Sequence, residues 1–466
     1  MSLLNAVMVP HPPLIIPAVG SREDRKIIQA TTDAYKKAAA FIHEAAPDTL
    51  IVISPHTVMY RDWFHISPGD WAEGDFENFG APEIRFEVDY DEELSDVITY
   101  RASDMRFPAG TMGEKAAWLD HGTMVPLYFL KEAYGDDPFP AILRVGLSGR
   151  PLFDHYYLGV LINGLAEELG RNISVVASGD LSHKLLESGP YGFDPAGPEY
   201  DRQIMDVMGA ADFSKLFEFS ESFCDNAAEC GHRAFTMMAG FFDGRQVKAE
   251  ALSHEGPFGV GYGVCLFTPG DTDPERDFLE GELRRQDEKL QELRAHEDEY
   301  VSLARNAVET YVKEQKSMLC PRMTEDRDLV ELRSGVFVSL HMDGQLRGCI
   351  GTIDPQTDCI GEEIILNAVN ACSRDPRFPA VSEEELPYLE YKVDVLTEPE
   401  PVPSADLLDP VKYGVVVTSG EKLGLLLPDL DGVDTVEKQI AIAKQKAGIN
   451  DGEECFLHRF TVIRHS

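Results

Sequence analysis

The chain has 466 residues, which is too long for one ordinary hydrophobic core and predicts two or three domains. Apolar residues make up 43% and charged residues 26% of the sequence, so a disordered or fibrous protein is excluded. Asp and Glu total 81 against 42 Lys and Arg, which gives a formal net charge of −39. Because that charge repels phosphate backbones and anionic lipids, we expect neither a nucleic-acid nor a membrane partner.

The sequence also indicates where the protein resides. No apolar run approaches the roughly 18 residues of a membrane-spanning helix. The N-terminus lacks a basic leader, which argues against a signal peptide. The eight cysteines are scattered without a CxxC pair, a pattern that favours reduced thiols. We therefore expect a cytoplasmic protein, and the sequence leaves its oligomeric state open.

The first part of the chain alternates strand-like apolar runs with helical patterns. Strands are predicted at Leu3–Val9, Leu50–Ser54 and Ser174–Ala177, helices at Lys26–Ala45 and Tyr156–Leu169, and a closing strand at Gly259–Phe267. Strands that alternate with helices at this spacing predict an α/β fold, a central sheet flanked by helices. The glycines of the closing strand do not form a dinucleotide-binding loop, because no helix follows them.

The composition changes after Pro269, and we place the first domain at residues 1–269. Residues 270–296 are rich in acidic side chains, with leucines at helical spacing, and predict a solvated linker helix. A partner-binding helix is the alternative interpretation of this segment. Residues 297–466 begin with an amphipathic helix followed by short strands and turns, which predicts a smaller α+β domain.

Three apolar runs of the first domain are each followed by a histidine: His11 after AVMVP, His56 after LIVISP and His183 after SVVASGDLS. Because ligands bind beyond the carboxyl ends of strands in an open α/β sheet, we expect these side chains to converge. His121 and Glu229 complete a plausible set. Two imidazoles and one carboxylate leave three open positions on Fe(II), which suits a site that holds substrate and dioxygen side by side.

Other polar residues have less certain roles. His155 begins a helical pattern and is interpreted as a capping or packing residue, whereas His254 could line the pocket. Asp120 and Asp180 could orient ring nitrogens of the neighbouring histidines or could be solvated. The loop Asp62–Pro82 could form a wall or lid of the site, or a subunit contact. Its aromatic side chains include Trp63, Phe64, Trp71 and Phe76.

The motifs VPHPP, SPH, DHGTMVPL and SGDLSH, with the later glutamate, make residues 1–268 similar to a known family. They resemble the class III extradiol dioxygenases of the LigB-like superfamily. The resemblance implies that His11, His56 and Glu229 hold Fe(II), with Zn, Mn or Cu as other candidate metals. It implies that His183 is the general acid/base and that His121 lies near substrate and dioxygen. The implied substrate is a catechol or a related small aromatic molecule.

The second domain carries LRGCIGT, SRDPRFPAV and a GLLLP segment, which resemble the AMME-syndrome candidate-region domain over residues 297–466. That domain is the A component of the AmmeMemoRadiSam set, and the resemblance implies no particular reaction. Cys349 follows Arg347 and could be an activated nucleophile, or a buried small residue at a tight strand turn. Arg374, Arg377 and Asp375 could bind an anion or form a surface ion-pair cluster.

The fusion of the two domains supports a second hypothesis. The B component of the same set is Memo-like and shares the first domain's fold without demonstrated ring cleavage. Memo-like proteins have Cys-Gly where this chain has Glu229–Cys230–Gly231, so Cys230 is an alternative ligand. The alternative function is a metal-binding component of a modification system with a radical-enzyme partner. His183 and His121 favour the dioxygenase hypothesis, and the fusion favours the Memo-like one.

Overall fold

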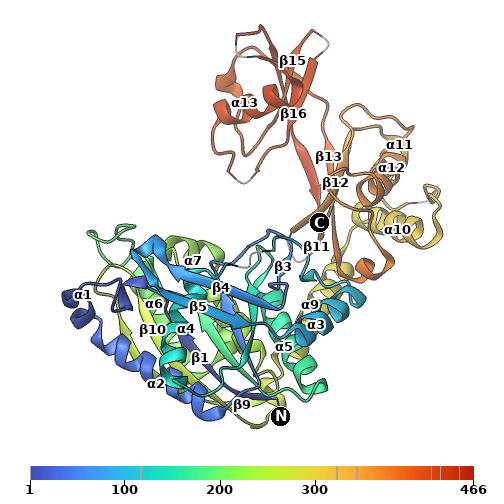
Figure 1. Cartoon of the computed structure of the whole chain (residues 1–466). Coiled ribbons are helices and arrows are strands. Elements are labelled where there is room, and N and C mark those ends of the chain that lie inside the picture. The colour runs from blue at the N-terminus through green and yellow to red at the C-terminus, as the bar shows by residue number, and fades with distance from the viewer. Residues whose placement is uncertain are drawn as a thin grey trace. The chain divides into compact units, whose positions relative to one another are not determined.

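The computed structural model describes residues 2–115, 118–321, 324–342, 345–420, 422–430, 432–450 and 452–466. The chain divides into two compact units, Met1–Glu282 and Leu283–Ser466 (Figure 1). The helix α9 (Phe278–His296), which lies in the segment predicted as a linker helix, contains the boundary between them. No helix among the described residues is long and apolar enough to cross a membrane.

The first unit is organised by a six-stranded sheet in the order β7-β2-β8-β1-β10-β9. Its strands are β1 (Leu3–Val9), β2 (Thr49–Ser54), β7 (Ala141–Gly146), β8 (Ile173–Ser178), β9 (Arg245–Glu255) and β10 (Tyr262–Thr272). The strands β7, β2, β8 and β1 are mutually parallel, whereas β10 and β9 form an antiparallel hairpin at one edge. The carboxyl ends of β2, β8 and β1 therefore lie side by side.

Helices cover both faces of this sheet, which confirms the predicted α/β fold (Figure 1). Side chains of β1 alternate between the faces, so Val7 and Val9 lie in the core that includes α2 and α4, and Met8 lies in the core that includes α5, α6 and α8. The helices are α1 (Arg22–Ile27), α2 (Gln29–Ala45), α3 (Glu92–Asp104), α4 (His121–Tyr134), α5 (Leu152–Glu168), α6 (Ala196–Ala210), α7 (Glu221–Ala227) and α8 (His232–Gly240).

The loop predicted as a wall or lid is mostly structured. It contains β3 (Phe64–His65) and β4 (Trp71–Phe76), which pair with β6 (Ala109–Gly110) and β5 (Ala81–Asp89) respectively. Phe64 and Phe76 are fully buried in the two cores of the unit and so are unable to act as lid residues.

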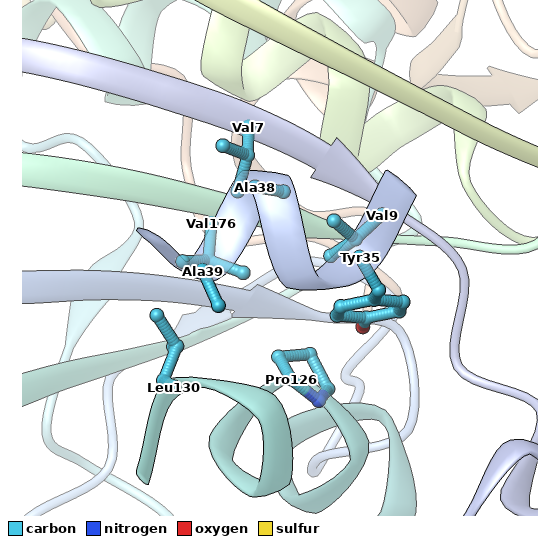
Figure 2. Close-up of a pocket in the computed structure, with 8 residues that line it drawn as sticks. All are labelled: Val7, Val9, Tyr35, Ala38, Ala39, Pro126, Leu130 and Val176. Carbon is cyan, nitrogen blue, oxygen red and sulfur yellow. The ribbon is translucent and has the colours of Figure 1, made fainter. Parts of the chain in front are cut away.

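A small apolar pocket lies between α2, α4 and the sheet, with a cavity volume of about 10 Å³. Figure 2 shows the eight side chains that line it: Val7, Val9, Tyr35, Ala38, Ala39, Pro126, Leu130 and Val176. Pro126 lies inside α4, where its ring reaches the pocket and packs near β1 and β8. The Tyr35 hydroxyl donates to the Pro10 carbonyl at 2.7 Å, so this lining residue keeps a polar partner.

The second unit contains two four-stranded sheets, as expected for a smaller α+β domain. One sheet consists of β12 (Gln345–Gly351), β11 (Val336–Met342), β13 (Leu389–Leu396) and β18 (Val462–His465). The other consists of β14 (Glu400–Val402), β17 (Phe456–Phe460), β15 (Gly414–Ser419) and β16 (Lys422–Leu426). The helices are α10 (Glu299–Glu314), α11 (Asp328–Glu331), α12 (Ile360–Ser373) and α13 (Val436–Ala447). The helices α10 and α12 pack on the first sheet and α13 on the second.

Candidate metal centre

Three neighbouring strands place histidines at one edge of the sheet. His11 follows β1, His56 follows β2 and His183 follows β8, the strand between them. The Nε2 atoms of His11 and His56 lie 2.9 Å apart, and their ring centroids are 4.7 Å apart. The structure thus brings together residues that are 45 positions apart in the chain.

Cys230 comes to the same point from the loop between α7 and α8. Its Sγ lies 3.6 Å from His11 Nε2, and ligand atoms of His11, His56 and Cys230 all lie within 4.8 Å of one another. Glycines allow this approach, because a Cβ on Gly179 would lie 2.3 Å from the Cα of Gly231. The SGD segment after β8 and the Cys-Gly pair can therefore pack backbone against backbone.

Glu229 is adjacent to Cys230, but its carboxylate is used elsewhere. Its Oε2 accepts a hydrogen bond from the backbone N–H of His232 at 2.6 Å, and the N–H of Gly231 also bonds the carboxylate. These donors belong to the beginning of α8, where a carboxylate is favoured by free N–H groups and the helix dipole. Glu229 is thus placed as a helix cap, and the structure clusters Cys230 with the two histidines instead.

Hydrogen bonds orient the His11 ring. Its Nδ1 lies 2.9 Å from Ser178 Oγ, and that hydroxyl donates to the carbonyl of Gly122 at 2.6 Å. The backbone N–H of His11 donates to Asp180 Oδ1 at 2.8 Å. Ser178 and Asp180, at the end of β8, therefore hold the ring and the backbone of His11, and Nε2 faces His56 and Cys230.

His183 and Asp180 border the cluster. The Nδ1 of His183 lies 2.5 Å from the carbonyl of Ala228 and must donate to it, so the neutral ring carries its lone pair on Nε2. That Nε2 lies 4.0 Å from Asp180 Oδ2, which is also 3.9 Å from His11 Nε2. The structure therefore gives His183 a free basic nitrogen beside the cluster.

His121 begins α4 and stacks on His56, with ring centroids 4.2 Å apart. The preceding residue, Asp120, caps α4 by accepting from the N–H and hydroxyl of Thr123, and it also accepts from Ser54 at 2.5 Å. Buried Arg144 lies 3.7 Å from the same carboxylate. Asp120 thus ties the start of α4, and with it His121, to the end of β2.

Burial sets the protonation of these groups. It lowers the pKa of His11 well below the ordinary imidazole value, and it lowers the pKa of His56 to about 4, with neighbouring histidines adding to both effects. Burial also lowers the pKa of His183. It raises the pKa of Asp180 to about 7 and the pKa of the Cys230 thiol well above its ordinary value. The histidines are therefore neutral near pH 7 and present lone pairs.

The His11, His56 and Cys230 atoms fit a bound metal ion. Ligands at about 2.1 Å for nitrogen and 2.3 Å for sulfur, in tetrahedral geometry, lie about 3.6 Å apart. His11 Nε2 and Cys230 Sγ lie 3.6 Å apart, whereas the Nε2 atoms of His11 and His56 lie 2.9 Å apart, close to the roughly 3.0 Å that two nitrogen ligands at 90° would show. A cation would also lower the pKa of the buried thiol, which is otherwise held in its protonated form.

Comparison with known protein families shows which family the domain with this cluster belongs to. Residues 5–265 match the family model described as the catalytic LigB subunit of aromatic ring-opening dioxygenase, which covers more than half of the chain. The chain belongs to the LigB family. Residues 301–465 match the AMMECR1 family model, and both matches confirm the resemblances found in the sequence.

The similar proteins match either the whole of the LigB-family chain or one part of it. Protein CA_C1420 of Clostridium acetobutylicum is 40% identical over 474 residues, which covers 100% of this chain and 99% of the relative. A protein of Thermotoga maritima is 47% identical over 171 residues, 36% of this chain and 98% of its own length. Among solved structures, protein PH0010 of Pyrococcus horikoshii is 32% identical, with coverages of 35% and 88% and a TM-score of 0.33. Protein JW3007 of Escherichia coli K12 is 17% identical, with coverages of 57% and 99% and a TM-score of 0.38.

Two further histidines of the LigB-family domain lie outside the cluster. His155 is fully buried in α5, where its Nδ1 donates to the Pro151 carbonyl at 3.0 Å and its Nε2 accepts from the N–H of Ser148. This placement matches the packing role expected from the sequence. His254 bonds Asp201 at 3.0 Å, and Asp201 also accepts the N–H of Ser182. His254 thus supports the loop that carries His183.

Sequence reasoning missed several neighbours of the LigB-family site. Phe79 lies 5.6 Å from the His121 ring, and Tyr191 lies 5.3 Å from the His183 ring, both partly exposed. Ser178 was also missed, although it lies in the SGDLSH segment that carried the resemblance. The position of Ser178 at the last residue of β8 was the available signal, whereas the contacts of Phe79 and Tyr191 depend on loop conformation.

In the AMMECR1-type region, the guanidinium of Arg347 bonds groups other than the Cys349 thiol. Arg347 bonds Glu385 at 2.6 and 3.1 Å and donates to the Pro379 carbonyl. Burial raises the pKa of Cys349, whereas activation would require a lowered pKa. Arg377 is the guanidinium that donates to the Cys349 carbonyl, at 3.1 Å.

Asp375 is buried and forms an ion pair with the exposed side chain of Arg377. Its Oδ2 accepts the backbone N–H of Cys349 at 2.9 Å and Arg377 Nη2 at 2.7 Å. Arg374 bonds Asn370 at 3.4 Å. Asp375 and Arg377 therefore form hydrogen bonds with the backbone N–H and C=O of Cys349 in β12. These bonds stabilise the strand and leave the two side chains less available to bind an anion.

Proposed function

We propose that the LigB-family domain is a mononuclear metal oxidoreductase of the dioxygenase type, with Fe(II) as its metal. The observation that carries the proposal is the convergence of His11, His56 and Cys230, with a basic nitrogen of His183 at the edge of the cluster. Two imidazoles and one thiolate suit Fe(II), Zn and Cu better than the hard cation Mn(II). In this proposal Cys230 replaces Glu229 as the third ligand, because the Glu229 carboxylate caps α8.

The residues around the metal would each have a separate role in the reaction. A bound Fe(II) supplies electron density to dioxygen and orients the substrate oxygens. His183 accepts a hydroxyl proton from the substrate at Nε2, since its Nδ1 proton is held by the Ala228 carbonyl. Asp180, whose pKa is raised to about 7, faces both His183 and His11 and can hold a proton between them. His121 stacks on the His56 ring and would border the site on the side where α4 begins.

The substrate proposed for this site is a small aromatic diol. Phe79 beside His121 and Tyr191 beside His183 offer two partly exposed rings next to the cluster. Aromatic side chains of this kind favour a flat apolar ring through edge and face contacts. The substrate hydroxyls would then be near His183 and the metal, and dioxygen would be the second substrate.

A second candidate function is supported by Cys230. A thiolate ligand in place of a carboxylate, together with the AMMECR1-type region, favours a metal-binding component of a modification system without ring cleavage. In that case the partner would be a radical enzyme, and His183 and His121 would not take part in a ring-cleavage reaction. The two candidates share the metal centre and differ in whether dioxygen is consumed.

The test is metal stoichiometry after anaerobic Fe(II) loading, followed by dioxygen uptake with a panel of catechols. We expect one iron per chain in the native protein, and loss of iron in His56→Ala and Cys230→Ser. Glu229→Gln retains the acceptor of the α8 cap and serves as the matched control, so we expect it to keep iron. His183→Ala should keep iron and lose dioxygen uptake.

The alternative results separate the candidates. Iron bound through Cys230 without dioxygen uptake for any catechol would favour the second candidate. Iron lost in Glu229→Gln and kept in Cys230→Ser would show that the carboxylate is the ligand. Iron binding that is indifferent to His56→Ala and Cys230→Ser would overturn both candidates.

A further inference from the structure

The helix α4 contains an internal proline whose consequence reaches the metal centre. Pro126 has no backbone N–H, so it is unable to donate to the carbonyl four residues earlier, that of Gly122. The Pro126 ring is packed in the apolar pocket between α2, α4 and the sheet, beside Val9 and Val176 (Figure 2). The helix is therefore held in place while the Gly122 carbonyl lacks its usual helical donor.

Ser178 supplies a donor to that carbonyl. Its Oγ lies 2.6 Å from the Gly122 oxygen, and a carbonyl can only accept, so the single hydroxyl proton is committed to this bond. The same oxygen lies 2.9 Å from Nδ1 of His11. Since its proton is already used, Ser178 Oγ can only accept from His11, and the proton of the neutral ring must be on Nδ1.

We propose that Ser178 is a positioning residue that fixes the tautomer of His11, and that Pro126 favours this arrangement by removing the helical N–H that would otherwise share the Gly122 carbonyl. The ring of His11 then carries its lone pair on Nε2, which faces His56 Nε2 at 2.9 Å and Cys230 Sγ at 3.6 Å. The role of this lone pair as a metal donor rests on the proposed function. The tautomer itself depends only on the hydrogen bonds of the ring with Ser178 and His56.

The ring nitrogens of His11 have two hydrogen-bonding neighbours, Ser178 at Nδ1 and His56 at Nε2; with Nδ1 protonated, His56 donates to His11 Nε2 in the metal-free protein. His11 is 2% exposed, so water has little access to the ring. Asp180 bonds the backbone N–H of His11 and lies 3.9 Å from Nε2, beyond hydrogen-bond distance. The free imidazole side chain slightly favours the proton on Nε2, so without Ser178 the intrinsic preference would turn a hydrogen toward the metal position.

The first experiment reads the tautomer in the metal-free native protein. A long-range ¹H–¹⁵N correlation spectrum of histidine-labelled protein, at about pH 8 and thus above the ordinary imidazole pKa, distinguishes protonated from unprotonated ring nitrogens. We expect His11 to show a protonated Nδ1 and an unprotonated Nε2. A protonated Nε2 in the native protein would overturn the proposal without any variant.

The second experiment measures the tautomer and Co(II) affinity in variants. Ser178→Ala should move the proton of His11 toward Nε2 and weaken Co(II) binding about 10- to 100-fold. Ser178→Thr keeps a hydroxyl and should retain both properties. Pro126→Ala returns an N–H to the Gly122 carbonyl and should give a mixed tautomer with a smaller loss of affinity. Leu130→Ala removes packing from the same pocket without adding a donor, and should leave the tautomer unchanged.

These outcomes separate this proposal from the proposed function. A native protein that binds neither Co(II) nor Fe(II), but whose tautomer follows Ser178, would overturn the metal function and support the hydrogen-bond relay. A protein that binds metal, with the His11 tautomer unchanged in both Ser178→Ala and Pro126→Ala, would overturn the relay and leave the metal function standing. Equal tautomer changes in Pro126→Ala and Leu130→Ala would show that packing, and not the missing N–H, is responsible.

Discussion

Each unit of the chain contains a cysteine beside a glycine in a tightly packed segment, and the two cysteines differ in what surrounds their sulfur. Cys230 faces the Nε2 of His11 at 3.6 Å, an atom that offers a lone pair. Cys349 faces the hydroxyl of Ser339 at 3.6 Å, and the charged groups near it bond the strand backbone. Burial raises the pKa of both thiols.

The comparison shows that the cysteine itself does not determine the chemistry. A buried thiol surrounded by neutral imidazoles can be deprotonated by a cation that the imidazoles also bind. The half-buried thiol of Cys349 lies beside a hydroxyl, with Asp375 and Arg377 bound to its own backbone, and among the described residues it has no such set of lone pairs nearby. We therefore expect metal binding at Cys230 and a structural role at Cys349.

The largest expected effect would test this difference directly. Cys230→Ser should weaken Co(II) binding more than about 100-fold and abolish the sulfur-to-cobalt charge-transfer absorption, because a metal ligand is lost. Cys349→Ser is the matched control and should leave both unchanged. Loss of the absorption in Cys349→Ser, and not in Cys230→Ser, would reverse the comparison.

Asp375→Ala should destabilise the second unit by about 3 kcal/mol, since it leaves the buried N–H of Cys349 without an acceptor and removes charge-assisted bonds to Arg377. Denaturant unfolding of the full chain, followed by signals from each unit, measures the change. Asp375→Asn keeps an acceptor and should cost less. Co(II) affinity should not change, and a weakened affinity would contradict the assignment of separate roles.

The two glycines beside the cysteines allow a third, smaller test. A Cβ on Gly231 would lie 2.4 Å from the Phe235 ring, and a Cβ on Gly348 would lie 2.4 Å from the Ala371 carbonyl oxygen. Gly231→Ala and Gly348→Ala should each lower the free energy of unfolding by about 2 kcal/mol through overpacking. Only Gly231→Ala should also weaken Co(II) binding. Equal effects of the two variants on affinity would argue against a metal centre at Cys230.

The smallest expected effect is a pH dependence. The raised pKa keeps the Cys230 thiol protonated at neutral pH, whereas the lowered pKa values of His11 and His56 leave these rings already neutral. Metal binding above about pH 7 should therefore release one proton, and affinity should rise about tenfold per pH unit. Calorimetry in buffers of different ionisation enthalpy measures that proton. A Cys230→Ser variant whose residual affinity keeps the same slope would exclude the thiol as its source.

Helix boundaries show how far local sequence signals reach. The helix expected at Tyr156–Leu169 begins at Leu152, directly after Pro151, because proline is compatible with the start of a helix and the next residues extend the pattern. The helix expected at Lys26–Ala45 is divided at Ile28, whose backbone leaves the helical region while its side chain is buried. The first difference arises from a local signal at Pro151, and the second from packing that the periodicity of the chain does not report.

The sequence by itself determined the α/β and α+β fold classes, both family resemblances and the placement of His11, His56 and His183 after strands. These follow from local patterns, because apolar runs form strands and the ends of parallel neighbours lie at one edge. Only the tertiary structure shows that Cys230, and not Glu229, lies within 4.8 Å of the two histidines. Adjacent loop residues point in different directions, and the free N–H groups at the start of α8 bind the carboxylate, which leaves the sulfur facing the histidines.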